Sequence, residues 1–296
     1  MHYLPLGSTF DKNTDERIIF NRVPKCGSRT ALDIFRYLAN RNQYNMISST
    51  IYGPLHLPEN KKVVQYLKFD SNQWSFSIYL NSCDLIKQLI RAAEPPVLFE
   101  RHMHFLTFPN SKRVRYINII RDPIDRFISQ YYFRRFGDDR NPMNFLGTDQ
   151  SKYQLQTINE CVLKRLPECS GNRLQYIIPF FCGHSPQCSL LNSSIPLDMA
   201  KANIKRSFVT VGLLEEIEDT FAVLEKAIPR LFQGATAEIV RRQKQKTSKP
   251  FQTKSKVMPT EEVNNILLEE MYWEYQLYDY VKERFKNQKK TLGIKR

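Results

Sequence analysis

Residues 24–30, Pro24-Lys25-Cys26-Gly27-Ser28-Arg29-Thr30, combine a lysine, a glycine and two hydroxyl side chains. They follow an apolar run that predicts a strand and precede a pattern that predicts a helix. Backbone amides at a helix N-terminus, with a nearby lysine and hydroxyl groups, form a binding site for a phosphate-like anion. The phosphate-binding loop of nucleoside triphosphatases has two glycines before its lysine, whereas here Gly27 follows Lys25. The pattern therefore argues against hydrolysis of a nucleoside triphosphate. Taken alone, the segment is equally typical of a capped turn with a surface lysine.

A second motif, R-D-P-x-x-R-x-x-S at residues 121–129, follows another buried apolar run. Arg121 stands at the predicted strand end, and Ser129 lies two turns into the next predicted helix, so the two side chains can bind a second phosphate group. Arg126 either takes part in this contact or pairs with Asp122. A capped helix alone explains such a motif, but two anion sites at neighbouring strand ends rarely arise by chance.

Five histidines stand at positions 2, 55, 102, 104 and 184. His102 follows the apolar run 97–100, which places it at a strand end, and an imidazole with a pKa near neutrality can remove a proton from a substrate hydroxyl. A surface or core histidine is the competing interpretation, and His104 is a candidate for a supporting role. Since no Asp, Glu and His residues cluster at metal-ligand spacing, we expect no metal.

The order of predicted elements is typical of an α/β fold with a central parallel sheet flanked by helices, whose ligands bind at the carboxyl ends of the strands. Asp122 is the predicted N-cap of a helix that has Pro123 at its first position. The predicted strands are residues 17–22, 97–100, 113–120 and 207–212. The predicted helices are residues 30–40, 59–68, 83–93, 123–136, 214–232 and 260–286.

Composition indicates a folded protein with an anionic partner. The 296 residues include 42% hydrophobic and 12% aromatic residues, which argues against disorder. The formal net charge of +14 is compatible with nucleic acid, an anionic membrane or a polyanionic substrate. Residues 241–260 contain seven Lys and Arg residues and no acidic residue, which favours an anion-binding loop or a disordered basic segment. No apolar run approaches the length of a membrane span.

Four of the six cysteines cluster in one region, in spacings that differ from those of zinc ribbons. Two local disulfides, Cys161 with Cys169 and Cys182 with Cys188, would favour an oxidising compartment. Four free thiols in a reducing compartment are the alternative, and His184 adds slight support for a metal site. Asn192-Ser193-Ser194 is an acceptor sequence for glycosylation.

These motifs carry a family resemblance. Residues 24–30 and 121–129 resemble the 5′-phosphosulfate loop and the 3′-phosphate motif of sulfotransferases that use 3′-phosphoadenosine 5′-phosphosulfate (PAPS). Further segments resemble the 2-O-sulfotransferases of glycosaminoglycan uronic acids: Asn21-Arg22-Val23-Pro24-Lys25, residues 131–138 (YYFRRFGD), residues 178–184 (IPFFCGH) and residues 211–216. Residues 26–30 and 101–106 are similar to the uronyl 2-O-sulfotransferase and insect Pipe branch. The heparan sulfate branch has a second histidine at the position of Glu100.

The resemblance implies a P-loop-like sulfotransferase fold in a domain at residues 17–288, with an N-terminal extension at 1–16 and a basic C-terminal tail at 289–296. It implies transfer of a sulfuryl group from PAPS, without a metal, to the 2-hydroxyl of an iduronyl or glucuronyl residue. His102 would be the general base, Lys25 would stabilise the leaving group, and His104 would assist. The implied cofactor contacts are Lys25, Cys26, Gly27, Ser28, Arg29, Thr30, Arg121, Ser129, Ser248, Thr253 and Lys256.

The resemblance also implies the partners and the compartment. The acceptor would be a sulfated glycosaminoglycan bound by Arg22 and Arg140, with Arg29, Arg134 and Arg135 as further candidates. Family members are type II membrane proteins of the Golgi lumen, so we expect that compartment, an anchor that is not in this sequence, and a homotrimer as one assembly. A catalytically silent polyanion-binding protein and an RNA-binding protein are the competing interpretations. Retention of the cofactor and base residues disfavours the first, and the second lacks a known RNA-binding pattern.

Overall fold

The computed structural model of the chain describes residues 16–48, 83–109, 113–138, 156–245, 253 and 255–294. The predicted helix at residues 59–68 lies outside these ranges.

The described residues form one parallel sheet, in the spatial order β2-β3-β1-β4-β5. The central strand β1 pairs with β3 on one side and with β4 on the other, so that Ile19 is the register partner of both Phe99 and Tyr116. Because every strand runs in the same direction, all the carboxyl ends lie at one edge of the sheet. The strands are β1 (Arg17–Asn21), β2 (Asn45–Ser48), β3 (Val97–Arg101), β4 (Val114–Ile120) and β5 (Phe208–Leu213).

Helices cover both faces of the sheet, which explains why β3 and β5 are buried along their whole length. Ile19 and Tyr116 point into one core and Ile18 and Ile117 into the other, as the alternation of side chains along a strand requires. The first core is packed by α2 (Cys83–Ala92), α6 (Ile178–Cys182), α7 (Ser194–Ser207) and α12 (Tyr272–Thr291). The second is packed by α1 (Ser28–Asn42), α8 (Ile217–Ala227), α9 (Pro229–Phe232) and α10 (Ala235–Lys244).

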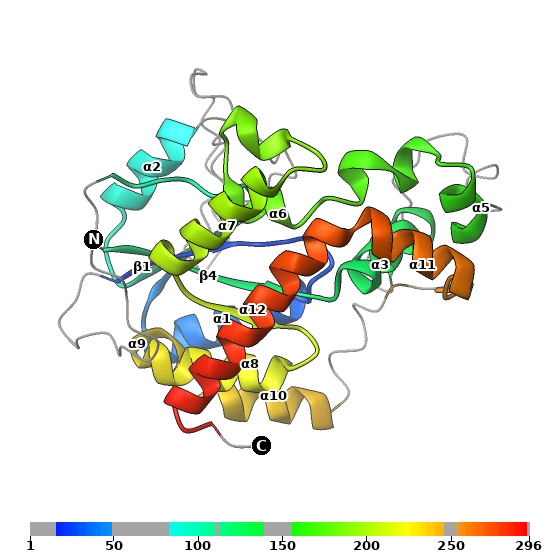
Figure 1. The fold of residues 1–296 in the computed structure, drawn as a ribbon. Coiled ribbons are helices and arrows are strands. Elements are labelled where there is room, and N and C mark those ends of the chain that lie inside the picture. The colour runs from blue at the N-terminus through cyan, green and yellow to red at the C-terminus, as the bar shows by residue number, and fades with distance from the viewer. Residues whose placement is uncertain are drawn as a thin grey trace.

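A third apolar cluster lies at one end of the molecule, where α3, α5 and α11 pack together (Figure 1). Helix α3 follows β4 directly, so this cluster borders the carboxyl edge of the sheet. Its helices are α3 (Pro123–Phe136), α5 (Ile158–Leu163) and α11 (Glu261–Glu270), with the 3₁₀ turn η1 (Pro167–Cys169) beside them. None of the helices in the described ranges combines the length and the apolar character that crossing a bilayer requires.

The predicted α/β architecture is confirmed, but two predicted helices are each divided in two. The pattern at residues 214–232 ends at Ala227 and resumes at Pro229, because a proline cannot donate the backbone hydrogen bond that a continuous helix needs. The pattern at residues 260–286 is divided at Met271, and its second part, α12, runs on to Thr291, past the predicted domain end at residue 288.

The start of the basic stretch, predicted to be a loop or a disordered segment, is helical. Arg241 and Arg242 belong to helix α10 and form ion pairs with Glu238, which lies one turn earlier on the same helix. They are therefore not part of a loop. Residues three and four positions apart are neighbours on a helix, so examining the residues just before Arg241 for an acidic partner would have found Glu238.

Both predicted disulfides are present. Cys161 is bonded to Cys169 and Cys182 to Cys188. Cys26 and Cys83 are buried thiols that are not in disulfides.

Candidate active site

The carboxyl ends of β1, β3 and β4 lie side by side, because β1 pairs in parallel with both of the other strands. Lys25 follows β1, His102 follows β3 and Arg121 follows β4. The parallel sheet therefore brings the predicted base and two predicted anion contacts to one edge, which is where ligands of α/β sheets bind.

The loop between β1 and α1 is shaped for an anion. Lys25 and Gly27 have left-handed backbone angles, with φ of 67° and 75°, and Gly27 is the N-cap of the long helix α1. Since a glycine has no side chain to accept from the first N–H groups of the helix, those groups can point at a ligand. A Cβ on Gly27 would lie 2.5 Å from the Leu214 side chain, and it would also strain the backbone at this φ.

The loop side chains differ in exposure. Ser28 is buried, Arg29 and Thr30 are half-buried, and the buried Cys26 thiol points back to its own loop, with Sγ 3.8 Å from the Pro24 carbonyl oxygen. Burial raises the pKa of Cys26 to about 12, so this side chain is a neutral thiol. The loop thus offers backbone amides, hydroxyls and cations but no anionic group of its own.

Lys25 lies in a region rich in positive charge. Its Nζ is 3.8 Å from the centroid of the Phe133 ring, and the Arg29 guanidinium is 5.1 Å from the same centroid. Burial, followed by the charge of Arg29, lowers the pKa of Lys25 to about 7, although Asp138 acts in the opposite direction. Arg29 itself forms an ion pair with the buried Asp138. An anion bound here would offset the repulsion between the two cations.

Residues of the basic stretch 241–260 reach helix α3. Thr253 Oγ1 lies 3.2 Å from Ser129 Oγ, and both residues are buried. Burial, followed by the charge of Arg121, lowers the pKa of Lys256. Arg121 donates to Asp125 Oδ2 at 2.7 Å. Two residues predicted to bind the 3′-phosphate, Arg121 and Ser129, therefore lie at the first half of α3. Thr253, predicted to belong to the closing loop, contacts Ser129 there.

The N-terminus of α3 is capped as predicted. Asp122 Oδ1 accepts a hydrogen bond from the Asp125 amide at 2.9 Å, and the Tyr275 hydroxyl donates to Asp122 Oδ2 at 3.0 Å. Instead of pairing with Asp122, Arg126 is buried with its guanidinium 4.4 Å from the centroid of Tyr176.

His102 is held in one tautomer by the residue that follows β1. Its Nδ1 lies 2.9 Å from the backbone carbonyl oxygen of Arg22. Because a carbonyl oxygen can only accept, Nδ1 carries the proton and Nε2 carries the lone pair. Burial, followed by the charge of Arg22, lowers the pKa of His102 to about 3. The half-buried imidazole is therefore neutral at physiological pH, which is the form that a general base requires.

Arg22, a predicted glycan contact, is buried and paired. Its Nε lies 2.6 Å from Glu100 Oε2, and the side chains of the two residues are 8% and 3% exposed. Glu100 stands where the resemblance indicates a second histidine in the heparan sulfate branch. Here its carboxylate instead fixes the arginine whose carbonyl orients His102.

His104 lies in different surroundings from His102. Its ring is 5.3 Å from Phe180 and 5.6 Å from His184, and it lines a separate pocket beside the disulfide of Cys182. Two other predicted site residues, Ser248 and Arg140, lie outside the described residues.

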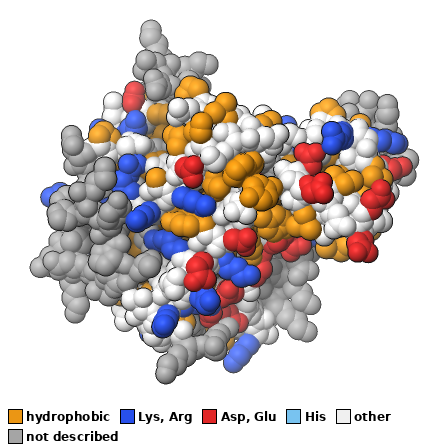
Figure 2. Space-filling model, viewed as in Figure 1, with side chains coloured by type: hydrophobic (Ala, Val, Ile, Leu, Met, Phe, Trp, Pro, Cys, Tyr) orange, Lys and Arg blue, Asp and Glu red, His pale blue; other side chains and the backbone are white. Residues whose placement is uncertain are grey.

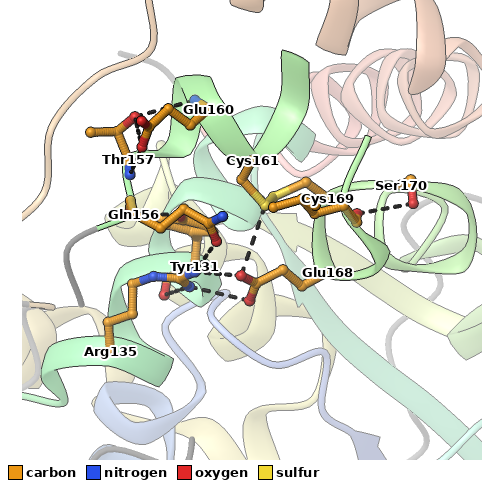
Figure 3. The surroundings of a disulfide bond; sticks show 10 residues. Tyr131, Arg135, Gln156, Thr157, Glu160, Cys161, Glu168, Cys169 and Ser170 are labelled. Atoms are coloured by element: carbon orange, nitrogen blue, oxygen red, sulfur yellow. Dashed lines mark hydrogen bonds and ion pairs between the residues drawn. A yellow bond between two sulfur atoms is a disulfide. The ribbon is translucent and has the colours of Figure 1, made fainter. Parts of the chain in front are cut away.

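Arg135, a further candidate for glycan binding, is built into the third apolar cluster. Figure 3 shows its guanidinium directed at the carboxylate of Glu168, next to the disulfide between Cys161 and Cys169. The side chain of Arg135 is fully buried, and its guanidinium carbon lies 3.5 Å from the centroid of the Tyr131 ring. The structure therefore gives Arg135 a packing role in place of the predicted contact.

Two residues of the site were missed by the sequence analysis. Phe133 provides the ring beside Lys25 and Arg29, and Asp138 pairs with Arg29 and forms a backbone bridge with Thr253. Both belong to the quoted segment 131–138, which served only as a sign of family. Within the described ranges, no three His, Cys, Asp or Glu side chains gather as possible metal ligands.

Comparisons with known proteins identify the family of the chain. The sulfotransferase family matches residues 8–281. Over 284 residues, the chain is 38% identical to the uronyl 2-sulfotransferase of Homo sapiens, and the match covers 94% of this chain and 64% of that relative. It is 34% identical to the heparan sulfate 2-O-sulfotransferase 1 of Homo sapiens, covering 94% of this chain and 73% of the relative. The chain thus spans just under two thirds of the length of the uronyl relative, and it belongs to the sulfotransferase family.

Proposed function

We propose that this chain is a glycosaminoglycan 2-O-sulfotransferase. It would transfer a sulfuryl group from PAPS to the 2-hydroxyl of an iduronyl or glucuronyl residue in dermatan, chondroitin or heparan sulfate. Support comes from the family match and from the names of two relatives, which specify a uronyl group in one case and heparan sulfate in the other.

The observation that carries the proposal is the hydrogen bond between His102 Nδ1 and the carbonyl oxygen of Arg22, at 2.9 Å. It assigns the lone pair to Nε2 on a histidine at the end of β3, next to the anion loop that follows β1. A positioned acceptor for a hydroxyl proton beside an anion site is what sulfuryl transfer to an alcohol needs.

The residues of the loop fit PAPS as the donor. Gly27 has no side chain to cap the N-terminus of α1, and a Cβ at this position would meet Leu214. Lys25 through Thr30 would hold the 5′-phosphosulfate end, and Arg121 and Ser129 would hold the 3′-phosphate, with Thr253 and Lys256 closing the site. Burial, followed by the charges of neighbouring cations, lowers the pKa of Lys25 to about 7, and these cations favour a multiply charged anion at this position.

When bound, PAPS supplies a sulfuryl group that is already activated by its bond to phosphate. Nε2 of His102 accepts the proton of the 2-hydroxyl as that oxygen forms its bond to sulfur. Lys25 stabilises the negative charge that develops on the phosphate oxygen as the bond from sulfur to that oxygen breaks. The two residues thus act on the entering and the leaving oxygen.

The acceptor would be recognised through its negative charge. Arg140 is the proposed contact, because the planar guanidinium suits carboxylate and sulfate groups, whereas Arg22 is buried and paired with Glu100. Action on a glycosaminoglycan, together with two disulfides, favours the Golgi lumen as the compartment. The homotrimer rests on the family resemblance alone.

The test is sulfate transfer from labelled PAPS to defined dermatan, chondroitin and heparan sulfates, followed by disaccharide analysis of the product. We expect label at the uronyl 2-position, and a loss in kcat of about 10²- to 10⁴-fold in His102→Ala. Wild-type affinity of His102→Ala for 3′-phosphoadenosine 5′-phosphate is the control for folding. Absence of transfer to every polysaccharide, or wild-type kcat in His102→Ala, would contradict the proposal.

A further inference from the structure

Asp122 stands at the junction between the two elements that carry the proposed 3′-phosphate contacts. Arg121 lies between β4 and Asp122, and Ser129 lies about two turns into α3, the helix that Asp122 caps. The angle at which α3 leaves β4 therefore sets how the side chains of Arg121 and Ser129 face one phosphate group. A contact that fixes Asp122 acts on both of them at once.

Two tyrosines of α12 reach this junction. The Tyr275 hydroxyl donates to the carboxylate of Asp122, at 3.0 Å from Oδ2 and 3.2 Å from Oδ1. The Tyr278 hydroxyl donates to Glu215 Oε2 at 3.3 Å, and Glu215 Oε1 accepts from the backbone amide of Asp122 at 2.9 Å. The side chain of Asp122 is thus tied to α12 directly, and its backbone is tied to the same helix through Glu215.

The segment that follows β5 extends these contacts to the donor loop. The Leu214 amide donates to the carbonyl oxygen of Ile120, the last residue of β4, at 2.8 Å. The Leu214 side chain lies 2.5 Å from the position that a Cβ on Gly27 would take. Since β4 separates β5 from β1 in the sheet, Leu214 reaches across the end of β4. Leu214 and Glu215 therefore connect the loop after β1 with the junction after β4.

Helix α12 runs from α11 toward α8 (Figure 1) and is held along its length. The carboxylate of Glu274, next to Tyr275, is fully buried and accepts backbone amides at the start of α6 at 2.8 to 3.0 Å. Gln288 Nε2 donates to a backbone carbonyl oxygen of β5 at 3.0 Å. Figure 2 shows acidic and basic side chains mixed over the lower half of α12, in line with the ion pair of Lys289 and Asp219. Such a helix is a rigid support for the groups that it contacts.

We propose that Tyr275 is a positioning residue for the 3′-phosphate of the donor, and that Tyr278 supports it through Glu215. The inference rests on the proposed function and names the residues through which α12 contributes to donor binding. Both hydroxyls act through other residues rather than on the phosphate itself. By holding Asp122, they fix the angle between β4 and α3.

The guanidinium of Arg121 depends on this angle. It donates to Asp125 Oδ2 at 2.7 Å, which fixes its plane relative to the first turn of α3. Because a guanidinium binds a phosphate through a rigid fork of N–H groups, a small rotation of the helix weakens the contact. A nucleotide without a 3′-phosphate does not use this fork. The hydroxyl of Tyr275 should therefore matter for one class of nucleotide and not for the other.

The test compares two nucleotides that differ only in the 3′-phosphate, 3′-phosphoadenosine 5′-phosphate and adenosine 5′-phosphate. Calorimetry measures the affinity for the first, and competition against it measures the affinity for the second. We expect Tyr275→Phe to weaken binding of the bisphosphate about tenfold, the equivalent of one hydrogen bond to a charged group, and to leave the affinity for the monophosphate unchanged. Tyr280 is half-buried on the same helix, so Tyr280→Phe is the matched control and should change neither affinity.

The selectivity of the loss is the decisive result. Equal losses for the two nucleotides would show a general structural effect and overturn the proposal, as would wild-type affinity for both. In an Arg121→Ala background, Tyr275→Phe should cause no further loss, because the contact through which it acts has been removed. Additive losses would contradict a role through Arg121. Tyr278→Phe should show the same preference for the bisphosphate as Tyr275→Phe, and equal losses there would remove Tyr278 from the proposal.

Kinetics separate this inference from the proposed function. With PAPS as donor, Tyr275→Phe should raise the KM for PAPS about tenfold and leave kcat unchanged, because the 3′-phosphate is bound alike in the ground state and the transition state. A fall in kcat at unchanged KM would contradict the positioning role and leave the sulfotransferase function intact. If the wild type transfers no sulfate at all, the proposed function fails, and the nucleotide titrations still decide whether Tyr275 acts on the 3′-phosphate.

Discussion

The backbone carbonyl of Arg22 accepts a hydrogen bond from His102 Nδ1, while the side chain of Arg22 is paired with Glu100. One residue at the end of β1 therefore fixes the tautomer of the imidazole and places a positive charge beside it. The charge adds to burial in lowering the pKa of His102 to about 3. A neutral ring with a defined lone pair follows from these contacts.

The first prediction concerns this ring. We expect the His102 imidazole of the free protein to remain neutral, with its proton on Nδ1, from pH 8 down to pH 5, because its pKa of about 3 lies well below this window. The nitrogen chemical shifts of ¹⁵N-histidine-labelled protein, assigned by comparison with His102→Ala, measure both properties. A titration midpoint near 6.5, or a proton on Nε2, would be inconsistent with the geometry.

The second prediction concerns the pH dependence of donor binding. Lys25 has a pKa of about 7 in the free protein, because burial and Arg29 disfavour its charged form. A bound anion favours the charged form, so the pKa rises on binding and a proton is taken up. The affinity for 3′-phosphoadenosine 5′-phosphate should therefore fall as the pH rises from 6.5 to 8.5.

Titration calorimetry in buffers of different ionisation enthalpy measures this proton uptake. Lys25→Arg is the matched variant, because an arginine keeps its charge throughout this range and should remove most of the pH dependence. Equal slopes of affinity against pH in the two proteins would exclude Lys25 as the titrating group.

The third prediction concerns stability at the α3–α5 end. Glu168→Gln leaves the buried guanidinium of Arg135 without a compensating charge, and we expect a loss of about 3 kcal/mol in the free energy of unfolding. Urea denaturation at constant disulfide content measures it. The control is Glu270→Gln, because its partner Arg165 is 79% exposed and such surface pairs contribute about 1 kcal/mol or less. Similar losses in both variants would show that burial does not strengthen the pair with Arg135.

Much of the fold follows from local sequence patterns. The apolar runs that precede Arg22, His102 and Arg121 are all strands, and Asp122 and Pro123 begin a helix as predicted. The edge strand β2 was missed, because its four residues include only two apolar ones and give no usable period. One predicted helix is divided at a proline, Pro229, and another at Met271.

The sequence predicted which residues lie at the site better than it predicted the contacts between them. Residue types at strand ends pointed to Lys25, His102 and Arg121, since a parallel sheet gathers such positions at one edge. The contact of Ser129 with Thr253 spans 124 positions and depends on how the chain returns to α3, which no local pattern encodes. The removal of Arg135 from the surface likewise depends on Glu168, a residue from a different segment.

The buried thiol of Cys26 has a consequence for the chemistry of the donor loop. The same oxidising conditions that allow the disulfides of Cys161 and Cys182 would also act on a reactive cysteine beside the anion site. Thiolates, not thiols, attack oxidants and disulfides, and burial raises the pKa of Cys26 to about 12. The thiol of Cys26, next to Lys25, can therefore remain unreactive under conditions in which four other cysteines of the chain form disulfides.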